Sequence, residues 1–473
     1  MINYYRLLGK ILLTIFFCTG LQVEASQPLS IPGQPGAPGP PAGPSEGGEE
    51  LTLPRAVEVA LQNNPRVKAT LSGREIVNAQ LQEARAGKWP LLQFSETFSR
   101  SNNPVFVFGS LLEQSRFGPQ NFNIEPLNNP DPLNNFRTAV NLKWALFDGL
   151  QSDTRIAQAR LGQEQADFQK ELIQQQVRFD TIRGYYGVLV ARERKIVAEE
   201  AVKMAESDRK RIADRLASGL VVHSDLLAAE VQVAEFRQQQ VQSAGELVTA
   251  HAFLNTVLGL PVQTSQKISG LLEDKHFSGL EAEELVRLAL QHRSDYARAN
   301  SALRAAGEEI RGAKGNYLPR VGLFSTYGIS GRDLASGSSD YAIGAGLTFD
   351  LFDSGRSARL DKARAAQSLV TAEQEHLANM IRLEVIEGYT HYESARARLK
   401  VAAGSVAQAQ EALRIVQDRY REGLTIITEV LRAETAFIRT RLNLIAARYD
   451  FYVGYARVLL ASGRLTDVGP FAY

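Results

Sequence analysis

The residue types that catalyse reactions or hold metal ions are few in this sequence and are poorly spaced for either task. The six histidines show no metal-ligand spacing. Gly344-Ala345-Gly346 lies in a strand-like stretch and is not followed by a helix-opening phosphate loop. No Ser/His/Asp or Cys/His motif stands out. We therefore expect a protein that is not an enzyme and that holds neither a metal ion nor a cofactor. The histidines are His223, His251, His276, His292, His376 and His391.

The charge balance and the cysteine content exclude further classes of protein. The chain has 473 residues, with 53 Lys and Arg against 52 Asp and Glu, so it lacks the basic surplus that nucleic-acid binding requires. A single cysteine, Cys18, rules out disulfides within the chain. All 18 prolines lie outside residues 133–260 and 320–469. Proline-free stretches of this length, rich in Ala, Gln, Glu, Arg and Leu, predict helices longer than those of ordinary globular domains.

The N-terminus is typical of an exported protein. Basic residues precede a short apolar run and a small-residue cleavage site, which predicts a signal peptide over residues 1–25. Residues 26–48 form a Pro/Gly-rich stretch that we interpret as a flexible tether. Lipidation of Cys18 is an alternative, although Phe17 before it is larger than lipoprotein processing prefers. No later segment is apolar for the roughly 18 residues that a transmembrane helix needs, so any membrane passage must be made by strands.

Two large segments of the chain repeat each other in order and spacing, as a duplicated module would. We predict a first repeat over residues 49–262, a second over residues 263–463 and a C-terminal tail over residues 464–473. The offset between the copies falls from 229 to 205 positions, which places an insertion of 24 residues between Ser101 and Asn135. The repeated motifs are Leu146-Phe147-Asp148 with Leu351-Phe352-Asp353, and Arg215-x-x-x-Gly219-Leu220 with Arg419-x-x-x-Gly423-Leu424.

Each repeat is predicted to contain a helix, two strands, a very long helix, a turn and a shorter helix. A helix over residues 151–216 would be roughly 100 Å long at about 1.5 Å per residue, so it must pack laterally against other helices. Gly219 and Gly423 end the long helices, and each repeat therefore forms a helical hairpin with a tip far from the strands. The first long helix has an apolar seam in alternating three- and four-residue steps. This seam consists of Leu161, Phe168, Leu172, Phe179, Ile182, Tyr186, Leu189 and Ile196.

Strand hairpins are predicted over residues 91–147 and 320–352. Their strands are close to the ~9 to 11 residues that a tilted strand needs to cross a bilayer. Four strands from one chain cannot close a barrel without leaving unpaired edges in lipid. Three chains would supply twelve strands, enough for a water-filled pore, whereas two would give a barrel that side chains fill. We predict a mainly α fold in which three chains build a twelve-stranded transmembrane β-barrel, continued by a long α-helical coiled-coil barrel.

Together, the export signal, the duplication, the paired Arg-x-x-x-Gly-Leu motifs, the Leu-Phe-Asp strand ends and the Tyr-x-x-Gly at residues 420–423 resemble the TolC family of outer-membrane efflux proteins. The resemblance covers nearly everything from Leu51 to Gly463. It implies a homotrimeric exit duct in the cell outer membrane whose helical barrel crosses the periplasm. Such a duct passes substrates from an inner-membrane pump and a periplasmic adaptor (a membrane fusion protein) to the exterior, in efflux or type I secretion, without doing chemistry itself.

The resemblance also implies a gate at the periplasmic tips. Family members close this end with a tyrosine and an aspartate, which correspond here to Tyr420 and Asp225, with Ser224 beside the aspartate. We predict that a hydrogen bond between Tyr420 and Asp225 helps to hold the tip shut. Two further gate residues, Glu429 and Arg432, correspond to acidic pore-lining positions of the family.

Two of these positions depart from the family pattern. Arg432 stands where the family has an acidic residue, and Thr425 stands where it has a gate arginine. Three copies of Glu429 would form an acidic ring that favours cations, which Arg432, three residues further along a helix, would neutralise. The alternative is that Glu429, Arg432 and Asp225 are solvated charges near a helix end.

Partner docking is predicted at the repeated tip motif, whose residues are Arg215, Gly219, Leu220, Arg419, Gly423 and Leu424. Helix termination is the alternative explanation for all six residues, and the glycines can serve both roles. An exposed leucine at each tip has no core to fill, which favours a periplasmic adaptor as partner. The alternative function is a periplasmic coiled-coil scaffold or adaptor without a pore, which would explain the export signal and the heptads but not the strands.

Overall fold

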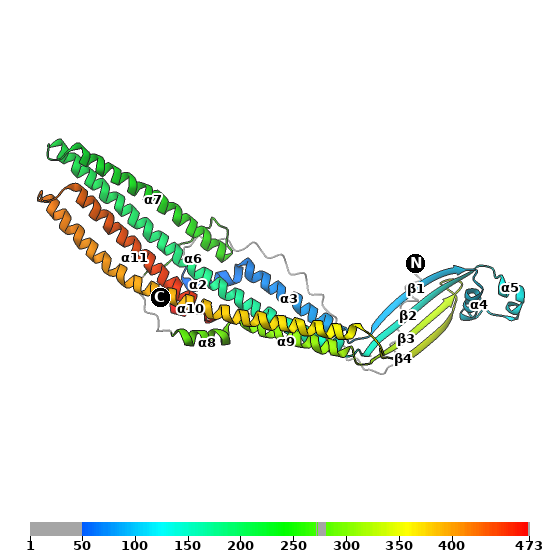
Figure 1. Ribbon diagram of the computed structural model, residues 1–473. Helices are drawn as coiled ribbons and strands as arrows, with labels where there is room; N and C mark the ends of the chain where they lie inside the picture. The colour runs from blue at the N-terminus through cyan, green and yellow to red at the C-terminus, as the bar shows by residue number, and fades with distance from the viewer. Residues whose placement is uncertain (1–49, 271, 273–280, 472–473) are drawn as a thin grey trace. The chain divides into compact units, whose positions relative to one another are not determined.

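The computed structural model describes residues 50–270, 272 and 281–471 of the chain. The predicted signal peptide and tether, residues 1–25 and 26–48, lie outside the described residues. The helices and strands of the described residues are labelled in Figure 1.

Both halves of the chain have the same order of elements: two helices, two strands, a long helix and a return helix. In the first half these are α2 (Leu53–Asn63), α3 (Pro65–Ala86), β1 (Leu91–Ser101), β2 (Leu133–Phe147), α6 (Gln151–Ala217) and α7 (His223–Leu258). In the second half they are α8 (Ala282–His292), α9 (Ser294–Gly315), β3 (Arg320–Gly331), β4 (Ser338–Thr348), α10 (Gly355–Arg421) and α11 (Ile427–Ala461). Three short elements, α4 (Pro104–Glu113), η1 (Pro119–Phe122) and α5 (Ile124–Asn128), separate β1 from β2, and η2 (Gly469–Phe471) follows α11.

Two helices, α6 and α10, dominate the structure, and each has 67 residues. The helix predicted over residues 151–216 is therefore confirmed. Aspartates of the two Leu-Phe-Asp motifs stand at the helix starts: Asp148 accepts a hydrogen bond from the Ser152 backbone N–H at 2.8 Å, and Asp353 accepts one from the Gly355 N–H at 2.9 Å. A carboxylate at the start of a helix accepts a hydrogen bond from an otherwise free backbone N–H group and interacts favourably with the positive end of the helix dipole. None of the helices that the structure describes is both long and apolar enough to cross a bilayer.

Helix α6 lies in the middle of a layer of helices. Toward the tips it packs between α7 and α11, and toward the sheet it packs between α3 and α9. Helix α10 contacts α11, α9 and α8. As a result, α7 and α3 form one edge of the layer and α10 forms the other (Figure 1).

The main core lies where α6 and α11 meet. Tyr186 of α6 and Tyr452 of α11 are fully buried and stack with 4.4 Å between ring centroids. Leu465 and Phe471, from the segment predicted to be a C-terminal tail, are also fully buried in this core. That segment is therefore part of the folded core as far as residue 471.

The predicted seam of α6 is correct in its central part and wrong at one end. Phe179, Ile182 and Leu189 are buried as expected, but Ile196 is 40% exposed. Val197 is buried in its place. A straight α-helix drifts relative to a strict 3.5-residue repeat, so a seam extended over many turns moves off the buried face.

The four strands form one antiparallel sheet in the order β1-β2-β3-β4. Pairing between β2 and β3 joins the two halves of the chain, with Val140 opposite Tyr327. The second strand hairpin ends earlier than predicted, since β4 stops at Thr348 while Leu351 and Phe352 are 88% and 89% exposed. Residues 349–352 instead turn the chain from the sheet into α10.

Candidate functional site

Two faces of the sheet differ in chemistry. Side chains alternate between the faces along a strand, and paired residues share a face. One face is mostly apolar and carries Leu92, Phe94, Phe98, Phe136, Val140, Leu142, Trp144, Leu323, Tyr327, Ile329, Tyr341, Ile343 and Leu347. The opposite face is mostly polar and carries Gln93, Ser95, Thr97, Asn135, Arg137, Asn141, Lys143, Thr326, Ser330, Ser338 and Asp340. The apolar face also carries a few polar side chains, among them Glu96 and Thr138, which hydrogen-bond to each other, Arg100 and Asn134, which do the same, and Ser325 and Ser339. The polar face in turn carries Leu91, Leu133 and Phe324.

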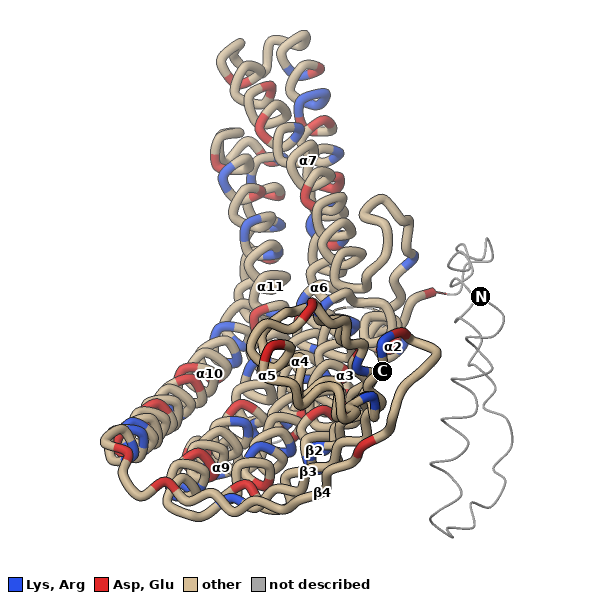
Figure 2. Tube along the Cα trace, turned by 90° about the vertical axis from the view of Figure 1, so that its right-hand side faces the viewer, with Lys and Arg blue, Asp and Glu red and all other residues tan. Residues whose placement is uncertain are grey.

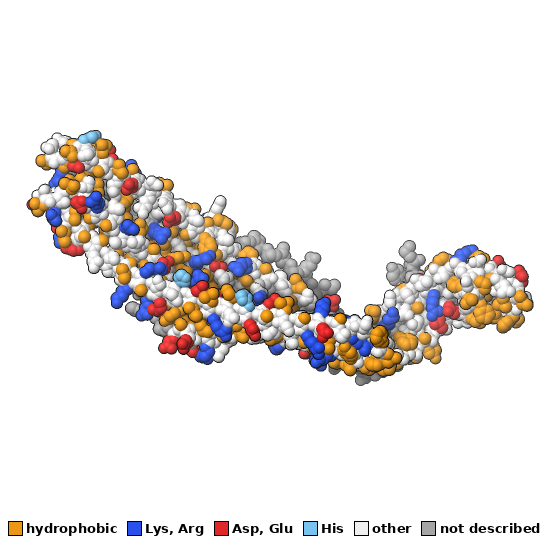
Figure 3. Space-filling model, viewed as in Figure 1, with side chains coloured by type: hydrophobic (Ala, Val, Ile, Leu, Met, Phe, Trp, Pro, Cys, Tyr) orange, Lys and Arg blue, Asp and Glu red, His pale blue; other side chains and the backbone are white. Residues whose placement is uncertain are grey.

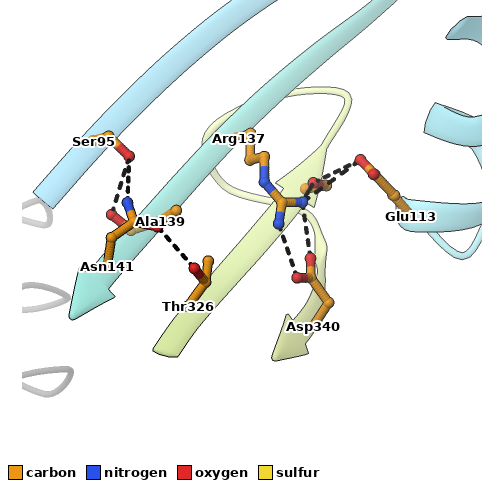
Figure 4. A network of polar contacts seen from close by, with 8 residues as sticks. Ser95, Glu113, Arg137, Ala139, Asn141, Thr326 and Asp340 are labelled. Carbon is orange, nitrogen blue, oxygen red and sulfur yellow. Dashed lines mark hydrogen bonds and ion pairs between the residues drawn. The ribbon is translucent and has the colours of Figure 1, made fainter. Parts of the chain in front are cut away.

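A row of hydrogen bonds runs across the polar face (Figure 4). The Asn141 side-chain N–H donates to the Ser95 hydroxyl at 3.3 Å, and the Thr326 hydroxyl donates to the Asn141 side-chain oxygen at 2.9 Å. Three neighbouring strands are thus linked by uncharged groups that also hydrogen-bond well to water. Such a surface suits the wall of an aqueous passage.

Arg137 is the centre of a charged network nearer the β1–β2 connection (Figure 4). Its guanidinium donates two hydrogen bonds to the Asp340 carboxylate, at 2.9 and 2.8 Å, and a third to the Ser330 hydroxyl at 2.9 Å. The Glu113 carboxylate, from α4, lies 3.6 Å from the same guanidinium. A bidentate arginine–carboxylate pair fixes geometry as well as charge, so β2, β4 and α4 are held together at this point.

At the far end of the long helices, the two tips have nearly the same backbone. Gly219 and Gly423 both have a φ of 73°, the left-handed conformation that ends a helix. The Leu220 N–H donates to the Arg215 carbonyl at 2.9 Å, and the equivalent bond from Leu424 measures 2.8 Å. Leu220 and Leu424 are 72% and 68% exposed. The glycines therefore terminate the helices, and the leucines remain free for a partner.

The two tips are joined by a small apolar cluster beneath the turns, in which Tyr420 packs. Its phenol hydroxyl is buried and has no hydrogen-bond partner within the described chain, so the predicted bond to Asp225 does not form inside one chain. The Arg215 guanidinium lies 4.7 Å from the centre of the Tyr420 ring, a cation–π contact. Arg215 of the predicted docking motif thus holds Tyr420 of the predicted gate. The cluster consists of Ile212, Ala229, Ile427, Val430 and Leu431.

The charged gate residues lie within the first two turns of the return helices. Glu429 and Arg432 form an exposed ion pair at 3.0 Å, as their spacing predicts. Ser224 is exposed, and Asp225 is half-buried in the first turn of α7. Acidic and basic residues are interspersed along the helices (Figure 2).

Sequence reasoning missed a buried carboxyl group a few turns from the tip. Glu434 of α11 is completely buried. One of its carboxylate oxygens accepts a hydrogen bond from the Gln417 amide at 3.4 Å, and the other has no partner in the described chain. Burial raises the pKa of Glu434 to about 7, opposed by the Gln417 hydrogen bond and the charge of Arg211. Steps of three or four residues along α11 place Glu434 on the same face as Ile427, but the packing of α11 against α6 and α10 decides that this face is buried.

A family model for outer membrane efflux proteins matches residues 56–260 and 285–464. The chain belongs to the outer membrane efflux protein family. This efflux-family chain is 23% identical over 424 residues to outer membrane efflux protein BepC of Brucella suis biovar 1 (strain 1330), a match that covers 88% of this chain and 86% of that protein. It is 25% identical over 435 residues to protein CyaE of Bordetella pertussis, covering 89% and 86%.

Solved channel structures show the same fold. The outer membrane channel CmeC of Campylobacter jejuni superposes with a TM-score of 0.77 at 17% identity, covering 88% of this chain and 86% of that one. The outer membrane protein VceC of Vibrio cholerae superposes with a TM-score of 0.73 at 18% identity, covering 87% and 96%. A mostly helical chain with a small antiparallel sheet is thus the fold of these channels.

Family membership confirms three predictions: the resemblance to TolC-like proteins, the location in the cell outer membrane, and the function as an exit duct for efflux or type I secretion. The relatives are channel and transport proteins, not enzymes. Among the residues that the structure describes, no three His, Cys, Asp or Glu side chains are grouped so that they could hold a metal ion.

Proposed function

We propose that three copies of this efflux-family chain form one duct, with a twelve-stranded barrel in the outer membrane and a helical barrel in the periplasm. The observation that supports this most directly is the division of the sheet into an apolar and a polar face. In a closed barrel the apolar face meets lipid and the polar face lines water. On the apolar face, Phe94, Ile343 and Leu347 are 59%, 70% and 71% exposed, which is costly in water and favourable in a membrane.

The edges of the chain support the same assembly. Within the described chain, β1 pairs only with β2 and β4 only with β3, so one side of each outer strand is left without a partner strand. Such edges are not tolerated in lipid. The helix layer has matching edges: α7 exposes Val241 and Val248, and α10 exposes Leu369 and Val401. Neighbouring copies would pair β4 with β1 and cover both helix edges.

At the periplasmic end, we propose that the tips bind a periplasmic adaptor and close the duct when it is idle. Leu220 and Leu424, exposed at the two tips, are the proposed contacts with the adaptor, supported by Arg215, Gly219, Arg419 and Gly423. Tyr420, Asp225, Ser224, Glu429 and Arg432 are the proposed gate. The pump that supplies the substrate belongs to the inner membrane. Relatives include a cation efflux system protein and a proteases secretion protein. Family membership is therefore compatible with both small and large substrates.

Assembly is tested by the mass of the mature protein purified in detergent and by planar-bilayer conductance. We expect a trimer that conducts ions. A monomer that stays soluble without detergent and forms no pore would favour the periplasmic scaffold instead.

Docking is tested by placing a photo-crosslinking amino acid at Leu220 in living cells. We expect it to capture a periplasmic adaptor, identified by mass spectrometry. The matched control is the same amino acid at Leu334, an apolar side chain that is 53% exposed in the β3–β4 connection. Capture of the adaptor at both positions, or at neither, would contradict docking at the tips.

A further inference from the structure

The two strand hairpins differ most in their connections. Residues 332–337 join β3 to β4, whereas residues 102–132 join β1 to β2 and contain three short helical elements. Asn103 caps α4 by accepting hydrogen bonds from the Val105 and Phe106 N–H groups at 3.0 and 3.2 Å. The longer connection is therefore an ordered structure, which we name the collar segment (residues 102–132).

The collar segment is attached to the polar face of the sheet. The Gln114 amide donates to the Asn135 side-chain oxygen and to the Asn134 carbonyl, both at 2.9 Å. The Ser115 hydroxyl donates to the Ser338 hydroxyl at 2.8 Å. Asn135 and Ser338 both belong to the polar face, so the end of α4 lies on the side that would face water in a closed barrel.

Charge fixes the same attachment. The Glu113 carboxylate lies 3.6 Å from the Arg137 guanidinium and accepts a hydrogen bond from the Ser330 hydroxyl at 3.3 Å. Asp340 already forms a bidentate pair with Arg137, so one arginine holds two carboxylates, one from the sheet and one from the collar segment. A segment with contacts to β2, β3 and β4 on one face cannot swing freely away from that face.

The other side of the collar segment is apolar and uncovered. Phe108, Phe117 and Phe122 pack edge to face, with ring centroids 4.8 and 5.1 Å apart. Val105 and Ile124 nevertheless remain 82% and 77% exposed. Figure 3 shows hydrophobic side chains gathered over this end of the molecule. Exposed apolar side chains on an ordered, anchored segment indicate that another surface covers them.

We propose that the collar segment projects into the outer mouth of the duct and meets the same segment of the two other copies, so that three segments narrow the exit. This inference rests on the proposed trimer, because its geometry requires the polar face to line the pore. The occupant of the apolar surface around Val105 is thus a second copy of this chain. The collar segment then sets the size of solute that can leave, at the end opposite the periplasmic gate.

The test places a single cysteine at Val105 in a chain whose Cys18 is replaced by serine, and measures trimer conductance in planar bilayers. A bulky thiol reagent added on the outer side should reduce the conductance of Val105→Cys channels at least twofold. The matched control is Leu334→Cys, which lies outside the collar segment in the β3–β4 connection and should keep its conductance after labelling.

A shortened variant gives an independent result. In channels whose periplasmic tips are open, replacing residues 104–131 with a short turn should at least double the conductance and admit larger neutral polymers from the outer side. Suppose that the wild-type protein forms open channels, but that neither labelling of Val105→Cys nor this deletion changes the conductance. This result would overturn the proposed role of the collar segment and leave the duct standing. Wild-type protein that forms no channels would overturn the duct itself, and the two failures are therefore distinguishable.

Discussion

The turn between α6 and α7 and the turn between α10 and α11 are nearly superimposable in backbone but are packed differently. Gly219 and Gly423 share a φ of 73°, and the residues before the return helices, Val222 and Ile426, have φ values of −93° and −94°. The four helix ends therefore follow the same local rules. What differs is the environment of the residues that follow.

Equivalent positions 204 residues apart show this difference. His223 is exposed in the first return helix, whereas its counterpart Ile427 is 2% exposed in the cluster that joins the tips. Glu230 is exposed, whereas Glu434 is completely buried. Helix α11 packs against α6 and α10, while α7 lies at the edge of the layer. The repeated sequence pattern is the same at both positions. The neighbouring helices in the tertiary structure therefore decide which carboxyl group is buried.

The largest expected effect concerns the apolar contact between the tips. Ile427→Ala should lower the local unfolding free energy of the tips by about 3 kcal/mol, because it removes buried methyl and methylene groups and leaves a cavity. The equivalent change His223→Ala should cost less than about 0.5 kcal/mol, since the side chain is exposed. Hydrogen exchange of tip amides measures both. Equal losses at the two positions would show that the edge helix is buried by another copy.

Next in size is the pH response of Glu434. Its pKa in the folded chain, about 7, lies above the ordinary glutamate value of 4.5, so the folded state binds the proton more tightly than the unfolded state does. The contribution of Glu434 to stability is therefore fully present below pH 4.5 and is lost as the pH rises through 7. Glu434→Gln should remove this fall and stabilise the tips by about 3 kcal/mol at pH 8.

The matched control for Glu434 is Glu230→Gln. It should leave the pH dependence of tip stability unchanged, because Glu230 is already in water. The measurement is hydrogen exchange of tip amides as a function of pH. A pH-independent tip in the wild-type protein would contradict the assignment of this titration to Glu434.

Substitution of the two glycines tests the backbone conformation that the two tips share. Gly219→Ala and Gly423→Ala should each cost about 1 kcal/mol, because a side chain strains the left-handed conformation. Neither position has another group close to the added methyl, so the two costs should be equal in thermal or exchange measurements. A much larger cost at one glycine would indicate that a neighbouring copy contacts that tip.

The smallest effect is expected at Tyr420. Tyr420→Phe removes a hydroxyl that has no partner in the described chain, so it should change local stability by less than about 0.5 kcal/mol. Single-channel conductance of Tyr420→Phe and Asp225→Asn tests the proposed gate. Conductance equal to wild type in both variants would contradict a role for Tyr420 and Asp225 in the gate.

Much of the fold follows from the sequence because its causes are local. Long proline-free stretches allow long helices, glycine in the left-handed conformation ends them, and alternation of side chains marks the strands. Boundaries that depend on packing are harder to predict from sequence. Ile196 does not belong to the buried seam of α6, and the second strand hairpin ends at Thr348. The role of residues 464–471 as core also depends on contacts that no local pattern shows.

By itself, the sequence determined the paired hairpins, their tips and the membership in an efflux family, because the repeat and its motifs are local and ordered. Only the tertiary structure decided that Tyr420 lies under Arg215, that Glu434 is buried while Glu230 is not, and that Arg137 joins β2, β4 and α4. These contacts link residues far apart in the chain, and their strength depends on which helices or strands become neighbours. Burial, not residue type, turns an ordinary glutamate into a group that titrates near neutral pH.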